Sequence, residues 1–189
     1  MAAGTQSVLI FISASATMEA DAFFLYFAYG SNMSAERLRA SDRAPSAQWM
    51  GSARATGHRL VFDKVGMDGS GKADCQRTDA PQDIVHGALY RIAQADRAAL
   101  DRAEGLGNGY DAFEIGVDTD AGVVLALTYR ATRKDATLKP FTWYLQHVLI
   151  GARQSGLPES YIAAIEGIAA AQDEDLAREA RERAIYAKR

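Results

Sequence analysis

The sequence predicts a single α+β domain, and two observations carry this prediction. Short apolar runs rich in aromatic and β-branched residues fill the middle of the chain, whereas the last third has the apolar spacing of helices. No segment repeats at solenoid spacing, and no low-complexity linker divides the chain. We therefore expect an irregular N-terminal extension over residues 1–21 and one domain over residues 22–189.

The domain is expected to begin with a buried strand that enters a tight turn. Residues 23–29 form an aromatic run that stops at Gly30, a pattern typical of a strand followed by a turn. Ser31 and Asn32 come next and carry the side-chain oxygens that cap helix N-termini. A short helix through residues 36–38 is therefore predicted after the turn.

The central part of the chain is predicted to be rich in strands. A strand is expected around residues 58–62, and the apolar alternation of residues 84–92 predicts a central strand. The Gly- and Asp-rich segment of residues 66–83 is predicted to be mostly loop. Residues 113–117 and 123–129 are expected to form a β-hairpin around a longer turn that contains a glycine.

Helices are predicted before and after this hairpin. Asp96 is a suitable N-cap for a helix that Gly105 terminates. Residues 141–154 and 161–171 are expected to be helical, which makes the last third of the domain mainly helix. Residues 173–189 place acidic side chains first and basic ones last, as the helix dipole favours, and predict a surface helix.

Charge and composition exclude several classes of protein. The formal net charge of −3 is the opposite of the positive footprint of nucleic-acid-binding proteins, so no such partner is expected. No apolar run reaches the roughly 20 residues that cross a bilayer, so no membrane partner is expected either. The single cysteine, Cys75, cannot form an internal disulfide, which favours a cytoplasmic compartment and a buried, unreactive thiol.

The apolar run of residues 8–13 resembles a short signal sequence only in part. No Lys or Arg precedes it, whereas secretory signals begin with a positively charged region. An irregular extension is therefore favoured, with Met18 as a second candidate for the start of the protein.

Two glycine-rich segments and the three histidines are better explained without phosphate or metal. Residues 66–72 match the opening of a phosphate-binding loop, but Ala73 stands where that loop requires Ser or Thr, so an ordinary hairpin or loop is predicted. Residues 105–109 follow a helix, whereas a dinucleotide-binding fingerprint follows a strand. His58, His86 and His147 have no second ligand at helical spacing, so no metal and no cofactor are expected.

Two other features suit chemistry. The turn within residues 26–32 places backbone N–H groups at a helix start, where they can hold a carboxylate or an oxyanion, although a plain strand-helix turn explains it equally well. Glu104 falls in the last turn of its predicted helix, where the helix dipole raises the pKa of a carboxylate. Such a group can exchange protons near neutral pH, but solvated glutamates at helix ends are also common.

Several motifs, in order along the chain, resemble the gamma-glutamylcyclotransferase family. Tyr26-Phe-Ala-Tyr-Gly-Ser-Asn-Met33 with Glu36-Arg-Leu38 resembles the opening signature of that family. Val85-His-Gly-Ala-Leu-Tyr90 and Leu100-Asp-Arg-Ala-Glu-Gly105 resemble its central strand and catalytic-glutamate segment, and Gly156-Leu-Pro158 resembles part of its C-terminal helical region. The resemblance runs from about residue 24 to about residue 170.

This resemblance implies a fold and a reaction. The implied fold is a small mixed β-barrel flanked by helices, and the implied protein is a cofactor-free enzyme. The implied reaction converts a small-molecule substrate, a gamma-glutamyl amino acid or amine, into 5-oxoproline and the freed amino acid or amine. By matched position, Glu104 is expected to be the catalytic acid and base. The implied substrate-binding residues are Tyr26, Phe27, Ala28, Tyr29, Gly30, Ser31, Asn32, Tyr110 and Tyr144.

Some points stay open from the sequence. The spacing between Glu104 and Tyr110 is one residue shorter than in the animal enzymes, which leaves the place of Tyr110 in the pocket open. One alternative is a protein of this fold that binds a gamma-glutamyl ligand without turning it over. Another is a cyclotransferase for a larger gamma-glutamyl-bearing biosynthetic intermediate, whose leaving group would contact loops at residues 66–81 and 132–139. The resemblance also allows a homodimer.

Overall fold

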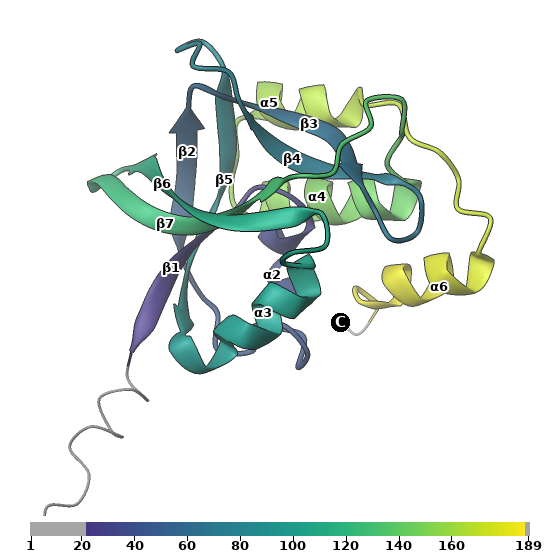
Figure 1. Cartoon of the computed structure of the whole chain (residues 1–189), viewed down its shortest axis with the longest axis horizontal. Coiled ribbons are helices and arrows are strands. Elements are labelled where there is room, and N and C mark those ends of the chain that lie inside the picture. Colours follow the sequence, from purple (N-terminus) through teal and green to yellow (C-terminus); the bar gives the residue numbers. More distant parts are fainter. Residues whose placement is uncertain (1–21, 188–189) are drawn as a thin grey trace, which may run out of the picture.

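The computed structural model describes residues 22–187, in which five strands close into a barrel with a hairpin and helices around it (Figure 1). The barrel strands are β1 (Phe23–Ala28), β2 (Gln48–Thr56), β5 (Ile84–Ala93), β6 (Tyr110–Thr119) and β7 (Gly122–Ala131). Their order is β1-β5-β2-β6-β7, and every neighbouring pair is antiparallel except β1 and β7, which are parallel. The prediction of an α+β fold with a mixed barrel is confirmed, and the extension expected over residues 1–21 lies outside the described residues.

Strands β3 (His58–Val65) and β4 (Gly71–Arg77) form a separate two-stranded antiparallel sheet. The prediction of a loop over residues 66–83 is therefore wrong for β4, whereas the hairpin proposed for residues 66–72 is correct. The hydrophobic pattern does not indicate this strand, because a polar residue, Asp74, occupies one of its fully buried positions. Asp74 accepts a hydrogen bond from the Ala131 backbone N–H at 2.8 Å and forms an ion pair with Lys134.

The turn after β1 differs from its prediction in one respect. The chain first makes a single 3-10 turn, η1 (Ser31–Met33), and only then the short helix α2 (Ala35–Leu38). The N-cap of α2 is Ser34, whose hydroxyl accepts from the Arg37 backbone N–H at 3.4 Å. The prediction that Ser31 and Asn32 cap the helix is wrong, because η1 separates them from it.

Helix α3 (Arg97–Glu104) follows β5 through the 3-10 turn η2 (Gln94–Asp96). Gly105 terminates it in the left-handed conformation, with φ of 73°, as predicted. Asp96 precedes the helix but does not cap it, because its carboxylate accepts hydrogen bonds from the backbone N–H and hydroxyl of Ser46. Glu104 is therefore the last residue of α3, immediately before the glycine.

The sequence prediction misses one barrel strand and misjudges one turn. Strand β2 is built largely from Gly, Ser, Ala and Thr, whose strand propensity is weak apart from Thr. The hairpin of β6 and β7 is longer than predicted, and its turn has two residues rather than the expected longer connection, since Thr119 pairs with Gly122. The buried thiol is confirmed, because Cys75 is fully buried and burial raises its pKa to about 12.

The C-terminal third contains helices α4 (Thr142–Gln154), α5 (Glu159–Glu166) and α6 (Leu176–Ala184). Helix α4 packs closely on η1, because a Cβ added at Gly151 would lie 2.4 Å from the Ser34 backbone nitrogen. The predicted helix over residues 161–171 is too long, since α5 ends at Glu166. Within residues 22–187, no helix has the length and apolar character needed to span a membrane.

Candidate active site

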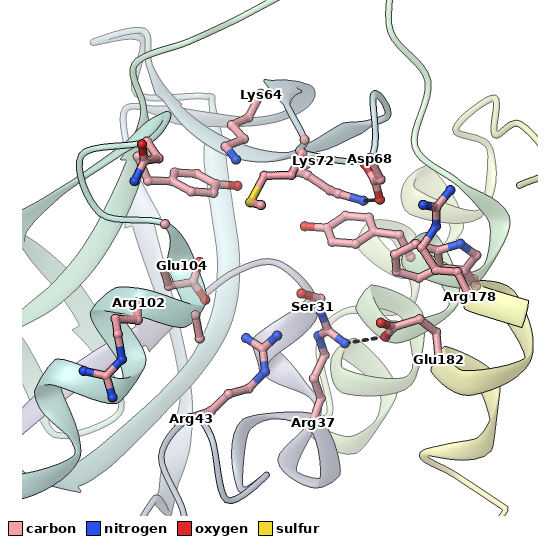
Figure 2. A pocket seen from close by; sticks show the side chains of 18 residues that line it. Ser31, Arg37, Arg43, Lys64, Asp68, Lys72, Arg102, Glu104, Arg178 and Glu182 are labelled. Atoms are coloured by element: carbon pink, nitrogen blue, oxygen red, sulfur yellow. Dashed lines mark hydrogen bonds and ion pairs between the residues drawn. The ribbon is translucent and has the colours of Figure 1, made fainter. Parts of the chain in front are cut away.

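A cavity of about 350 Å³ lies between the C-terminal end of α3, the β3–β4 hairpin and helix α6. Figure 2 shows Glu104 on one side of it, Lys64 above, and the ion-paired Arg37 and Glu182 on another side. A hollow of about 20 Å³, close to the space of one water molecule, shares Glu104 and two tyrosines with this cavity. We call them the outer cavity and the inner hollow.

Glu104 stands where the two spaces meet. Asn32 Nδ2 donates a hydrogen bond to Glu104 Oε1 and lies 3.4 Å from the Tyr26 hydroxyl. The amide oxygen of Asn32 in turn accepts from Arg43 Nη1 at 3.4 Å. Burial raises the pKa of Glu104, and the nearby charges of Arg43, Arg37 and Lys64 only partly oppose this rise. The predicted rise is thus confirmed in direction, and burial is its largest cause.

The turn after β1 forms the floor of the inner hollow. Its first internal hydrogen bond runs from the Met33 N–H to the Gly30 carbonyl at 3.0 Å. The N–H groups of Gly30, Ser31 and Asn32 precede this bond and therefore have no acceptor within the turn. A Cβ at Gly30 would lie 3.0 Å from Ala73 Cβ and 3.3 Å from the Tyr144 hydroxyl, so glycine permits the close approach of β4.

Two tyrosines hold the strand that closes the hollow. The Tyr110 hydroxyl donates to the Ala73 carbonyl, and the Tyr144 hydroxyl accepts from the Ala73 N–H at 3.1 Å. Both rings line the inner hollow and the outer cavity. Tyr110 therefore lies in the pocket even though its spacing from Glu104 is one residue shorter than in the animal enzymes. Sequence reasoning missed Ala73, because an alanine that contributes only backbone atoms leaves no recognisable signal.

The structure brings together most of the residues that the resemblance implies, without testing their roles. The inner hollow is lined by Glu104 with Tyr26, Tyr29, Gly30, Ser31, Asn32, Tyr110 and Tyr144. Phe27 and Ala28 do not line it, and both are buried in the core. The Phe27 ring instead packs against Gly87 of the neighbouring strand β5, because strand residues alternate between faces.

The positive charge of the outer cavity is a feature that sequence reasoning missed. Within residues 22–187, six cationic side chains and three carboxylates line it. The cations are Arg37, Arg43, Lys64, Lys72, Arg102 and Arg178. They come from segments far apart in a chain of negative net charge, so composition does not show them. No group of three metal-ligating side chains occurs in the described part of the chain.

Comparisons with known proteins agree with this arrangement. The model of the AIG2-like family matches residues 84–165. A gamma-glutamylcyclotransferase from Mus musculus is 31% identical over 77% of this chain and 78% of its own length. Another from Bos taurus is 30% identical over 73% of this chain and 74% of its own. A solved structure of a gamma-glutamyl cyclotransferase has a TM-score of 0.73 and 26% identity, and the match covers 85% of this chain and 99% of that one.

The two curated relatives cover most of the chain at this level of identity, and the solved structure has the same fold over most of both chains. The chain is therefore an enzyme of the gamma-glutamylcyclotransferase family.

Proposed function

We propose that the enzyme converts gamma-glutamyl amino acids or amines into 5-oxoproline and the free amino acid or amine. The observation that carries the proposal is the position of the Glu104 carboxylate, which is held by Asn32 where the inner hollow opens into the outer cavity. Because the inner hollow has the space of about one water molecule, only a charged end of a folded gamma-glutamyl group would reach into it, and the rest of that group and its leaving group would lie in the outer cavity. Intramolecular attack needs only the reactive conformer and a proton carrier.

Glu104 is proposed as that proton carrier. Its carboxylate takes a proton from the substrate's α-ammonium, and the freed amine attacks the side-chain carbonyl carbon to close a five-membered ring. The bond from that carbon to the leaving nitrogen then breaks, while Glu104 returns the proton to the departing nitrogen. The second proton lost by the attacking nitrogen ends on the freed amine, so the reaction needs no other reactant.

The turn after β1 is proposed to hold the negative charges of the substrate. The N–H groups of Gly30, Ser31 and Asn32 have no acceptor within the turn, so they can donate to the α-carboxylate or to the developing oxyanion. Tyr110 and Tyr144 are anchored to Ala73 and are proposed to orient the glutamyl chain between them. These roles follow the residues that the resemblance implies.

A second candidate is the same reaction on a larger gamma-glutamyl-bearing substrate. The outer cavity favours it, because about 350 Å³ exceeds the space that a small amine fills. The loop between β3 and β4 contributes Gly66, Met67 and Asp68 to this cavity, as the sequence suggested for the leaving-group side.

The test is 5-oxoproline formation from gamma-glutamyl-alanine by the purified enzyme. N-acetyl-gamma-glutamyl-alanine is the matched control, because its blocked α-nitrogen cannot attack as an amine. We expect 5-oxoproline and free alanine in equal amounts from the first compound and no cyclised product from the second. If free glutamate, rather than 5-oxoproline, appears together with the released alanine, the enzyme hydrolyses the substrate and the proposed cyclisation is refuted. Turnover confined to longer gamma-glutamyl compounds would favour the second candidate.

A further inference from the structure

Three lysines lie side by side where the β3–β4 hairpin borders the outer cavity. Lys64 of β3 pairs in register with Lys72 of β4 and forms an isolated bridge with Lys134. Lys72 lies 2.7 Å from an oxygen of Asp68, and Lys134 forms an ion pair with Asp74. Within residues 22–187, Lys64 forms no ion pair and its ammonium takes part in no hydrogen bond, so it alone of the three lacks a carboxylate partner.

Lys64 is nevertheless buried and directed at the cavity. It is 5% exposed, and its ammonium lies 4.6 Å from the centre of the Tyr110 ring. The register of β3 shifts between Val61 and Lys64, and such bulges turn a side chain toward a site. Burial lowers the pKa of Lys64, and the charges of Glu104 and Asp68, neither of them ion-paired with it, only partly oppose this. A buried charge of this kind is costly unless a ligand neutralises it.

The other cations of the outer cavity already have partners or lie at its edge. Arg37 binds Glu182 and Arg178 binds Asp173, while Arg102 is exposed. Arg43 donates to Asn32 and acts on Glu104 through its charge. Lys64, like Arg43, acts on Glu104 through its charge. It is nevertheless the buried cation of the outer cavity that has no hydrogen-bonded or ion-paired partner among residues 22–187, so it is the one left for a ligand.

The place of Lys64 indicates which part of a substrate it meets. Tyr110 lines the inner hollow together with Glu104, and the Lys64 ammonium lies over its ring. In the proposed function, the leaving nitrogen takes its proton from Glu104. If the leaving group is an amino acid, its α-carboxylate is only two covalent bonds from that nitrogen, on the side of the outer cavity.

We propose that Lys64 is a specificity-determining residue that binds the carboxylate of the leaving amino acid and so separates substrates with a charged leaving group from those with a neutral one. This inference rests on the proposed function and adds to it the residue that contacts the leaving group. The sequence offered no signal for it, because Lys64 lies outside the motifs that resemble the family.

The test compares gamma-glutamyl-alanine with gamma-glutamyl-alaninamide, which has the same shape but no negative charge on the leaving group. A hydrogen bond between charged groups predicts a roughly tenfold to hundredfold preference of the wild type for the first substrate in kcat/KM. In Lys64→Met the ratio should fall to nearly one. Loss of the Lys64 charge near Glu104 changes the turnover of both substrates alike, so the ratio isolates the contact with the leaving carboxylate. Lys64→Arg should keep most of the preference.

The matched control is Arg133→Met. Arg133 is an exposed cation whose charge acts on Lys64 without lining the outer cavity. This variant removes the same charge from the same neighbourhood and should keep the wild-type ratio. Lys64→Gln serves as a second neutral variant if Lys64→Met folds poorly, and the ratio is measured within each protein, so loss of folded enzyme cancels.

Two results would overturn the inference while the proposed function stands. One is a wild type that turns over both substrates equally well. The other is an equal fall with both substrates in Lys64→Met and Lys64→Gln, which would show a structural role instead. A wild type that forms 5-oxoproline neither from these two compounds nor from longer gamma-glutamyl compounds would refute the proposed function itself, and the role of Lys64 with it.

Discussion

Glu104 combines a chemical advantage with a cost to folding. Its pKa is raised in the folded protein by burial, so the folded state binds a proton more tightly than the unfolded chain, where the ordinary value is 4.5. Above that value the unfolded chain is ionised at no cost, and the folded state must bury the charge. The Glu104 carboxylate therefore lowers the free energy of unfolding as pH rises from 4.5 through the raised pKa of the folded protein.

Glu104→Gln should consequently leave the stability at pH 7 unchanged or raise it. The glutamine keeps the oxygen that accepts from Asn32 and removes the buried charge. Thermal unfolding of the two proteins at pH 7 and pH 5 measures the effect, and any stabilisation should shrink at the lower pH. A variant that melts several degrees below the wild type at pH 7 would show that the carboxylate stabilises the fold.

The pH dependence of kcat/KM should also reflect the ionisation of Glu104. A base must be ionised to accept a proton, so kcat/KM should fall as pH drops through the raised pKa of Glu104, which lies above 4.5. The profile of wild-type kcat/KM between pH 4.5 and 8 checks this. In Glu104→Gln the residual rate should lack this acid limb, and an unchanged limb in the variant would assign it to another group.

At the scale of single residues, the sequence shows the site residues whose side-chain type and order are unusual, and it does not show the others. The turn after β1 and Glu104 could be found because Gly, Ser, Asn and a glutamate before a glycine are unusual in that order. Ala73 could not be found, because it contributes only backbone atoms to the site. Lys64 could not be found either, because its burial beside Tyr110 without an ion-paired carboxylate is visible only in the structure.

At the scale of elements, β4 depends on contacts that are distant along the chain. Its buried Asp74 is satisfied by the Ala131 backbone and by Lys134, residues that no local pattern connects to it. The strand therefore looks like a loop in the sequence, whereas the aromatic run of β1 and the glycine that ends α3 carry their structure locally. Because β4 contributes Ala73 to the inner hollow, a prediction without this strand also lacks that side of the site.

Asp74→Asn should destabilise the protein by about 2 kcal/mol, because a charged hydrogen-bonded acceptor is lost in the interior. Asp79→Asn is the matched control, since its ion pair with Arg77 is exposed and such pairs contribute about 0–1 kcal/mol. Urea unfolding of both variants at pH 7 measures the difference. Equal effects of the two substitutions would show that the Asp74 pair does not hold β4 to β7.

At the scale of the whole molecule, the C-terminal helix completes the outer cavity. Helix α6 contributes Arg178 and Glu182 to it and lies across from the end of α3 (Figure 1). Glu182 binds Arg37 at 2.7 Å and lies 3.0 Å from His147 of α4. Although burial acts to raise the pKa of Glu182, the His147 hydrogen bond and the Arg37 charge lower it to about 2.

A lowered pKa means that Glu182 stabilises the fold above its ordinary value of 4.5 and loses this effect as pH falls through about 2. Glu182→Gln should therefore cost about 1–3 kcal/mol at pH 7, and less at pH 3. Urea unfolding at both pH values checks this, with the exposed Glu174→Gln as control. A loss that does not shrink at pH 3 would mean that the charge of Glu182 does not anchor α6.

Helix α6 was predicted from its charge order alone, and its contacts could not be, because Glu182 meets Arg37 across most of the chain length. The homodimer that the resemblance allows stays a prediction, which sedimentation of the purified protein tests.

The central claim is that Glu104 carries the proton in 5-oxoproline formation. The most direct measurement is the rate of 5-oxoproline formation from gamma-glutamyl-alanine by the wild type and by Glu104→Gln, with both confirmed as folded. Loss of a general acid and base predicts a fall of roughly 10² to 10⁴, or about 3–5 kcal/mol of barrier. A folded variant that keeps more than a tenth of the wild-type rate would contradict this role.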